Sequence, residues 1–314
     1  MDTKHLGIIL DSKLNFRKHI SEKIKTANKG LGLLKFLSKY LTREKLSLIY
    51  KIHVRPHLDY GDVIYHNQSL ESMDLLESIQ YQAALIVTGC WKGSSREKLY
   101  AELGWESLND RRHFRRLTLY YKIKNYLTPN YLSLLAQPFD QNHTNRFKSS
   151  FFPYCYTYWS ILDQNIKNSI SLETFKKTIL KDIRPSPKST FEVRDRRGVS
   201  IISQLRVQLS DLRAHRFHHN FNCPSPDCPC GSDIESIIHY LLHCSRYRNQ
   251  RATFMQHIRE IIPNFDQLSD QDLVSILLFG HKSFKRDVNA SILAATIAFI
   301  HKTKRFTKLE AFNR

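Results

Sequence analysis

The chain has 314 residues, of which 41% are hydrophobic and 11% aromatic, so it can bury a sizeable core and is not expected to be disordered throughout. Its 48 Lys and Arg against 29 Asp and Glu give a formal net charge of +19, which points first to nucleic acid and second to an acidic membrane surface. The longest apolar stretches fall well short of the roughly 20 residues that span a bilayer. Six cysteines in so long a chain make no disulfide framework, so we expect an intracellular protein, in the cytoplasm, the nucleus or both.

The first sixty residues predict a short strand followed by helix. The apolar run at residues 6–10 indicates a short buried strand or the arm of a hairpin, and basic residues then accumulate with few acids between them. A helix is expected after Leu41, with Thr42 as its N-cap and Pro56 as its stop, because proline lacks the amide hydrogen that a helix interior needs.

Three further helices follow before residue 130. The apolar spacing predicts a helix over residues 70–88, with Ser69 as its N-cap and Gly89 just past its end. A short helix is expected over residues 94–101, and another opens at Ser107 and runs to about residue 127. We therefore predict a mainly α class: a helical domain behind a short N-terminal strand or hairpin, and a helical C-terminal domain that contains a small module resembling a zinc knuckle.

The second half of the chain contains the strongest linker signal. Residues 137–153 indicate a loop, an aromatic patch follows at 151–159, and Ser171 is expected to cap the next helix. The proline- and serine-rich residues 185–189 indicate the main domain boundary. A basic helix is expected from about residue 200 to 217, followed by a cluster of cysteine and histidine residues and two or three further helices.

The positive charge is concentrated in two segments. In the predicted helix after Ser107, the pairs 111/115 and 112/116 place like charges four residues apart, which costs stability unless a polyanion offsets it. We therefore interpret this helix as a surface that contacts phosphate groups, and the alternative is a solvated helix face. The candidate nucleic-acid-binding residues are Arg111, Arg112, Arg115, Arg116 and Lys122 in this helix, and Arg194, Arg196, Arg197, Arg213 and Arg216 in the second segment.

Four of the six cysteines lie within residues 223–244, beside two histidines. Thiolate and imidazole ligands at this density suit tetrahedral zinc, and the favoured set is Cys228, Cys230, His239 and Cys244. On a regular α-helix, positions 239 and 244 lie about 140° apart, so both can bind one ion only if the helix loosens before Cys244. Alternative ligands are Cys223 and His243, and a set of free or buried thiols is the other interpretation. Four protein ligands occupy all the coordination sites of a tetrahedral ion and leave no open position for a substrate. We therefore expect a structural Zn²⁺.

Several segments, taken in order, resemble one family. They are the opening His5-Leu6-Gly7-Ile8-Ile9-Leu10-Asp11, the segment Tyr50-Lys51-Ile52-His53-Val54-Arg55-Pro56-His57-Leu58-Asp59-Tyr60-Gly61, the triplet Leu103-Gly104-Trp105 with Arg111-Arg112, the aromatic residues 151–159, and the Cys/His cluster closed by Tyr247 and Arg251. In this order and spacing they resemble the C-terminal part of non-LTR (LINE-type, jockey-like) retrotransposon reverse transcriptases. The resemblance covers roughly residues 5–251.

The resemblance implies a division of the chain and a function. It implies the primer-grip end of a palm at residues 1–20, a helical thumb-like domain at 21–135, a connector at 136–184, a basic helix with the zinc module at 185–250 and C-terminal helices at 251–314. The implied partners are RNA and DNA, gripped as a template hybrid or as target DNA. The parent family is an RNA-directed DNA polymerase.

The polymerase chemistry itself needs carboxylates that the sequence does not provide. Two Mg²⁺ ions about 4 Å apart require a pair of adjacent aspartates and a third one upstream, and no Asp-Asp dipeptide occurs in this chain. We therefore expect a truncated portion of such a polymerase, whose palm would precede Met1, with no Mg²⁺ site and no activity of its own. The alternative is a non-catalytic zinc-containing interaction protein whose basic helices bind acidic partners.

Overall fold

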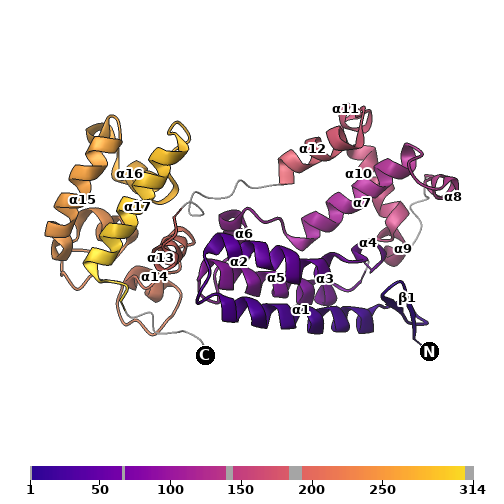
Figure 1. The fold of residues 1–314 in the computed structure, drawn as a ribbon, viewed down its shortest axis with the longest axis horizontal. Helices are drawn as coiled ribbons and strands as arrows, with labels where there is room; N and C mark the ends of the chain where they lie inside the picture. The colour runs from indigo at the N-terminus through magenta and orange to yellow at the C-terminus, as the bar shows by residue number, and fades with distance from the viewer. Residues whose placement is uncertain (1, 66–67, 139–143, 184–192, 308–314) are drawn as a thin grey trace. The chain divides into compact units, whose positions relative to one another are not determined.

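The computed structural model describes residues 2–65, 68–138, 144–183 and 193–307 (Figure 1). It divides into two compact units: the first comprises Met1–Phe36, Leu48–Ala83 and Gly104–Ser186, and the second Leu37–Ser47, Ala84–Leu103 and Pro187–Arg314. Two segments that the resemblance places in the thumb-like domain, 37–47 and 84–103, thus belong to the second unit. The expected boundary at residues 185–189 lies outside the described residues. The mainly α-helical class with an N-terminal hairpin is confirmed.

The N-terminus is a two-stranded hairpin. Strands β1 (Thr3–His5) and β2 (Ile8–Leu10) pair antiparallel, with Thr3 opposite Leu10. Leu6 and Gly7 form the turn between them with φ of 45° and 80°, and the Leu6 side chain is exposed. The prediction of one buried strand from residue 6 to residue 10 was therefore wrong for its first two positions, because this pair adopts the left-handed conformation that a tight hairpin requires.

Pro56 does not end the helical segment in which it lies. Helix α2 (Arg43–Ile49) continues into a π-helical turn, η1 (Tyr50–Val54), in which the Arg55 amide donates to the Tyr50 carbonyl. Helix α3 (Arg55–Asp59) then begins with Pro56 in its first turn. The first amides of a helix have no partner within it, so the missing N–H costs nothing there. The predicted stop at Pro56 was wrong for this reason.

The next helices begin at the predicted caps. Helix α5 (Leu70–Thr88) has the predicted bounds, with the Ser69 hydroxyl accepting from the Ser72 amide at 3.3 Å and Gly89 at a φ of 72°. The Ser107 hydroxyl accepts from the Asp110 amide at 3.0 Å and caps helix α7 (Leu108–Lys124). The Ser171 hydroxyl accepts from the Thr174 amide at 3.1 Å and caps helix α12 (Leu172–Ile183). The short helix α6 (Arg96–Leu103) lies between α5 and α7 in the chain.

Helix α7 organises the core of the first unit. It packs against α10 and α12, where Tyr121 stacks on Phe175 with ring centroids 4.3 Å apart, beside Leu117 and Ile179. The loop predicted over residues 137–153 contains α9 and the start of α10, which accepts Pro153 in its first turn. The remaining helices of this unit are α1 (Arg17–Leu37), α4 (Asp62–Tyr65), α8 (Asn130–Leu134), α9 (Asn145–Lys148), α10 (Phe151–Ile161) and α11 (Gln164–Lys167).

The second unit contains two helices where one basic helix was expected. Helices α13 (Arg196–Arg206) and α14 (Arg213–His218) are separated by residues 207–212, where Gln208 has a φ of 61°. Ile201, Ile202 and Leu205 of α13 are buried in the core of the unit, so α13 is a core element. The other elements are the turns η3 (His239–His243), η4 (Ser245–Tyr247) and η5 (Phe265–Gln267), and the helices α15 (Arg248–Ile261), α16 (Asp270–Phe279) and α17 (Arg286–Thr303).

A buried ion-pair network crosses the second unit. The Glu102 carboxylate, 2% exposed, accepts from the guanidinium groups of Arg43 at 2.9 Å and Arg206 at 2.8 Å, and the Ser203 hydroxyl donates to it at 3.0 Å. Burial raises the pKa of Glu102, but Arg206 and Arg43 outweigh it and hold that pKa below 4.5. A buried charge persists only when it is paired, so these two arginines have an internal role.

None of the helices in the described ranges combines the length and apolar run that crossing a bilayer needs.

Candidate metal centre

The first two candidate ligands lie on a tight turn. The Cys228 amide donates to the Asp233 carbonyl at 2.8 Å, and the Gly231 amide donates to the Cys228 carbonyl at 2.9 Å. Gly231 has a φ of 80°, a conformation that glycine adopts without a steric penalty. An antiparallel bridge between Asp227 and Ile234 closes the turn. The local sequence thus folds into a knuckle that holds Cys228 and Cys230 close together.

The other two candidate ligands lie at the ends of the π-helical turn η3. The Cys244 amide donates to the carbonyl of His239, five residues earlier, at 2.7 Å, and Cys244 leaves the helix with a ψ of 119°. A π-turn holds more residues than an α-turn, so it brings position 244 back toward the side of position 239. This is the loosening of the helix that the ligand spacing requires.

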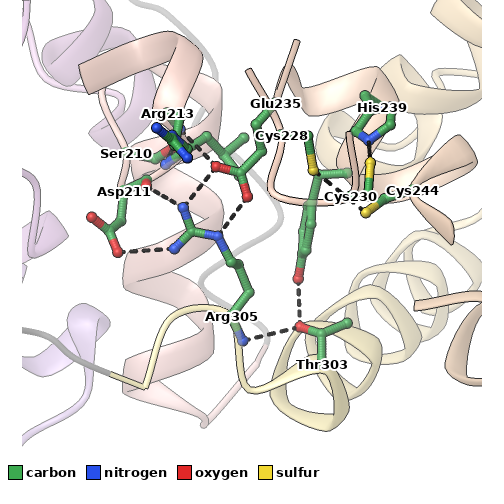
Figure 2. Close-up of polar contacts among 12 residues, drawn as sticks. Ser210, Asp211, Arg213, Cys228, Cys230, Glu235, His239, Cys244, Thr303 and Arg305 are labelled. Atoms are coloured by element: carbon green, nitrogen blue, oxygen red, sulfur yellow. Dashed lines mark hydrogen bonds and ion pairs between the residues drawn. The ribbon is translucent and has the colours of Figure 1, made fainter. Parts of the chain in front are cut away.

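The four side chains converge (Figure 2). One ligand atom from each of Cys228, Cys230, His239 and Cys244 lies within 4.8 Å of all the others. The Cys228 and Cys244 sulfurs are 3.6 Å apart, and the Cys230 sulfur is 3.2 Å from His239 Nε2. A disulfide requires about 2.05 Å between sulfurs, so these are thiols. This Cys₃His cluster, the candidate metal centre, could hold a metal ion.

Local interactions favour a thiolate in the cluster. The hydroxyl and amide of Ser232 hydrogen-bond the Cys230 sulfur and lower the pKa of that thiol to about 5. Burial raises the pKa of the Cys228 thiol. A metal ion binds the thiolate form, so Cys230 offers a ligand that is already ionised at neutral pH.

Groups around the cluster hold its ligands in place. At the end of the π-turn, the Arg251 guanidinium donates to the carbonyl oxygens of Leu241 at 2.9 Å and Cys244 at 2.7 Å. The Asp233 carboxylate lies 3.9 Å from Nδ1 of His239, on the side of the ring away from the thiols. This separation is longer than a direct hydrogen bond, so Asp233 is a neighbour of the ring and does not fix its orientation. Arg251 was already part of the family resemblance, as the residue that closes the Cys/His cluster. Asp233 was not predicted, and the only signal for it in the sequence is that it lies close to the cysteines.

An ion-pair network connects the segment that contains the candidate metal centre with the end of α17 (Figure 2). Glu235, 1% exposed, accepts from Arg305 Nε at 2.6 Å and from the Arg213 amide at 2.8 Å, and Asp211 accepts from Arg305 at 3.1 Å. Burial lowers the pKa of Arg305, but Glu235 and Asp211 outweigh it and raise that pKa above its ordinary value. Tyr240 and Thr303 share a hydrogen bond of 2.8 Å beside it. The candidate metal centre is therefore part of the second unit's core.

The two alternative ligands point elsewhere. The Cys223 thiol approaches the Ser225 carbonyl at 3.2 Å, and His243 Nε2 lies 2.6 Å from the Asp270 carboxylate. Neither belongs to the cluster of possible ligands in the described ranges. The geometry thus selects the favoured set over its alternatives.

The arginines of α7 do not form an exposed basic surface. Arg112 and Arg116 are 3% and 1% exposed, and the Arg116 guanidinium lies 3.8 Å from the ring centroid of Tyr154. Arg111 donates to Asp59 at 2.6 Å, and Arg115 donates to Asp62 at 3.1 Å. Buried carboxylates in the same unit thus offset the charges of Arg111 and Arg115, whereas Arg116 donates to the Ser149 carbonyl. The prediction of phosphate contacts was wrong for Arg112 and Arg116, because both are buried.

The sequence did not reveal these carboxylate partners because they lie about fifty positions before α7. A signal was present in Asp59 and Asp62, two acids in a basic region, but their spacing did not specify a site. Glu106 also accepts from Arg111, at 3.3 Å. Lys122, the last candidate in α7, is half-buried.

The second group of candidates is also mainly engaged inside its unit. Arg194 is exposed, whereas Arg196 donates to the carbonyls of Ser38 and Ile86, both at 2.8 Å. The other hydrogen bonds run from Arg197 to the Phe306 carbonyl, from Arg213 to the Ser225 carbonyl and from Arg216 to Asp211. Most of these arginines therefore cap backbone carbonyls or pair with acids.

Neither protein-family models, nor curated proteins, nor solved structures gave a match to this chain.

Proposed function

We propose that the protein binds nucleic acid without polymerising it, and that it corresponds to the C-terminal part of a non-LTR retrotransposon reverse transcriptase with one structural Zn²⁺. The order and spacing of the quoted segments support the family. The +19 charge and the candidate metal centre support a zinc-containing nucleic-acid-binding protein.

The donor set supports zinc as the metal. At Zn–S distances of about 2.3 Å, two sulfurs on a tetrahedral ion lie about 3.8 Å apart, close to the 3.6 Å between Cys228 and Cys244. A sulfur and a nitrogen ligand lie roughly 3.5 Å apart on such an ion, close to the 3.2 Å between Cys230 and His239. Three thiolates and one imidazole fill a tetrahedral ion, which is the arrangement of structural zinc sites.

The exposed face of α1 is the main structural support for the proposed nucleic-acid binding. It presents Arg17, Lys18, Lys25, Lys29 and Lys35, all exposed, against the single acid Glu22. Lys18 pairs with Asp2, and Lys25 pairs with Glu22, but exposed ion pairs contribute little and dissociate readily in favour of a phosphate. This basic face of α1 replaces α7 as the proposed phosphate-contacting surface.

Binding of a labelled RNA–DNA hybrid and of duplex DNA, followed by anisotropy over a range of salt, tests this surface. The variant Arg17→Gln, Lys25→Gln, Lys29→Gln should bind more weakly. It should also flatten the log K against log salt slope by about 0.9 for each duplex phosphate that it no longer neutralises. The matched control Lys124→Gln, Lys148→Gln, Lys177→Gln removes three exposed charges elsewhere in the same unit. Equal losses in both variants would contradict the assignment to α1, and equal binding of heparin and nucleic acid would favour the acidic-partner alternative.

Primer extension on an RNA template tests the absence of polymerisation. Extension with Mg²⁺ or Mn²⁺ should stay at background, because the sequence contains no adjacent aspartates to hold two metal ions. Extension that a single carboxylate substitution in this chain abolishes would contradict the proposal.

A further inference from the structure

A pocket in the second unit gathers lysine and histidine side chains that the proposed metal centre and the basic face of α1 do not use. It has a volume of about 430 Å³ and lies between the start of α6 and the region of α14. Its lining includes Lys98, His215, His218 and His219, together with Ser94 and Ser95. Four basic side chains thus line one cavity.

These groups converge on Gln208. Lys98 Nζ lies 3.1 Å from its side-chain oxygen, and His219 Nε2 lies 3.3 Å from its carbonyl oxygen. Gln208 has a φ of 61°, a conformation that is strained for a residue other than glycine. Such strain is concentrated at functional sites, where the surrounding structure holds the backbone in place. Lys98 and His219 therefore both contact one residue, Gln208.

Among the residues that the structure describes, no carboxylate lines the pocket. Glu97 and Asp211, the acids nearest to it in the sequence, are not among its lining residues, and Asp211 pairs with Arg305 and Arg216. Lys98 is positively charged at neutral pH, and the imidazoles of His218 and His219 carry N–H donors, so an anion finds complementary groups here. The arrangement therefore favours an anionic ligand. Lys98, His218 and His219 are exposed, so they remain accessible to it.

Aromatic rings next to the pocket favour a nucleic acid as the source of the anion. Phe221 packs edge-on against Trp91 at 6.1 Å between centroids, and its ring lies 6.2 Å from that of His219. Aromatic faces beside a cationic groove are the arrangement on which the bases of single-stranded nucleic acids stack. The cavity is also larger than a bare phosphate ion requires.

We propose that this pocket binds a backbone phosphate of a single-stranded nucleic acid, with Lys98, His218 and His219 as its contacts. The identity of the phosphate source rests on the proposed function. The pocket itself belongs to a different unit from the basic face of α1, so the two surfaces can be tested separately.

The test uses the full chain with its metal and a fluorescein-labelled oligothymidylate. The pocket variant Lys98→Gln, His218→Gln should bind about tenfold more weakly than the wild-type chain, with a salt slope lower by about 0.7 for each phosphate that it no longer neutralises. Lys98→Arg keeps the charge and should retain most of the affinity. The matched control Lys302→Gln, His257→Gln removes an exposed lysine and histidine of the same unit and should bind like the wild type. Unchanged binding by the pocket variant would overturn the proposal.

A second measurement separates this inference from the proposed function. Thermal unfolding is compared in sodium phosphate and in sodium chloride of equal ionic strength, for the wild type and the pocket variant. Stabilisation by phosphate that the pocket variant loses, together with its weaker oligonucleotide binding, supports the proposal. If only the α1 variant weakens nucleic-acid binding, the proposed function stands and the pocket assignment fails. If phosphate stabilises the wild type but no nucleic acid binds, the pocket takes free phosphate and both proposals are overturned.

Discussion

The backbone amide of Cys244 donates to the carbonyl of His239, five residues earlier, over 2.7 Å. In a regular α-helix that carbonyl would accept from His243, and the His239 and Cys244 side chains would lie on different sides of the helix. The π-turn instead brings both residues to the cluster with Cys228 and Cys230, while His243 faces Asp270. One extra residue in a single turn therefore decides which histidine joins the thiols.

The full chain should bind one equivalent of zinc through this cluster. The variant Cys228→Ser, Cys230→Ser should lose the metal and much of the second unit's stability, because metal binding contributes to folding. Cys223→Ser is the matched control, since that thiol lies outside the cluster, and it should keep its zinc. Zinc content by mass spectrometry and the absorption of the cobalt-substituted protein measure this. Stoichiometric zinc in the double variant would place the site elsewhere.

Arg251→Gln should weaken the metal centre without changing its ligands. The guanidinium donates to the carbonyls of Tyr240, Leu241 and Cys244 around the π-turn, so its removal takes a charged donor away from these acceptors. We expect the free energy of unfolding to fall by about 1–3 kcal/mol and the zinc affinity to decrease, with an unchanged cobalt spectrum. Arg248→Gln, an exposed position on the same helix, is the control. Equal effects of the two substitutions would argue against this positioning role.

Arg111→Gln, Arg115→Gln should destabilise the first unit rather than impair nucleic-acid binding. Both arginines pair with buried carboxylates. Removing their guanidinium groups therefore takes these ion-pair partners away from Asp59 and Asp62. We expect a loss of about 3 kcal/mol in the free energy of unfolding, measured by chemical denaturation. Lys124→Gln on the same helix should be nearly neutral. A stable double variant with much weaker binding of RNA–DNA hybrid would restore α7 as the binding surface.

Stability should fall as the pH decreases from about 6.5 toward 4, in part because of His215. Burial, helped by His219, His218 and Lys98, lowers the pKa of His215 from 6.5 to about 4. Within this window the unfolded chain takes up a proton that the folded chain does not, so acidification favours unfolding. His215→Gln removes this titration, and its unfolding free energy should depend less on pH between these values. Parallel pH profiles for the variant and the wild type would contradict the assignment.

Features that depend only on neighbouring residues could be predicted from the amino-acid sequence. Ser69, Ser107 and Ser171 cap α5, α7 and α12 because a cap needs only a hydroxyl and an amide a few positions apart. The Cys/His cluster was predictable for a similar reason, since two closely spaced cysteines and a histidine–cysteine pair lie within seventeen residues. The mainly α class followed from the apolar spacing of the helices.

The roles of the charged residues, in contrast, depend on which segments pack together in the folded chain. A run of arginines has the same sequence pattern whether it faces solvent or a buried acid, and the partners of α7 lie more than fifty positions away. The same holds for Glu102, which pairs with Arg43 and Arg206 across the second unit. Pairing depends on which segments pack together, and burial makes an unpaired charge too costly to leave in place. The fold thus uses many of its arginines internally, while α1 and the pocket beside α14 keep exposed basic side chains.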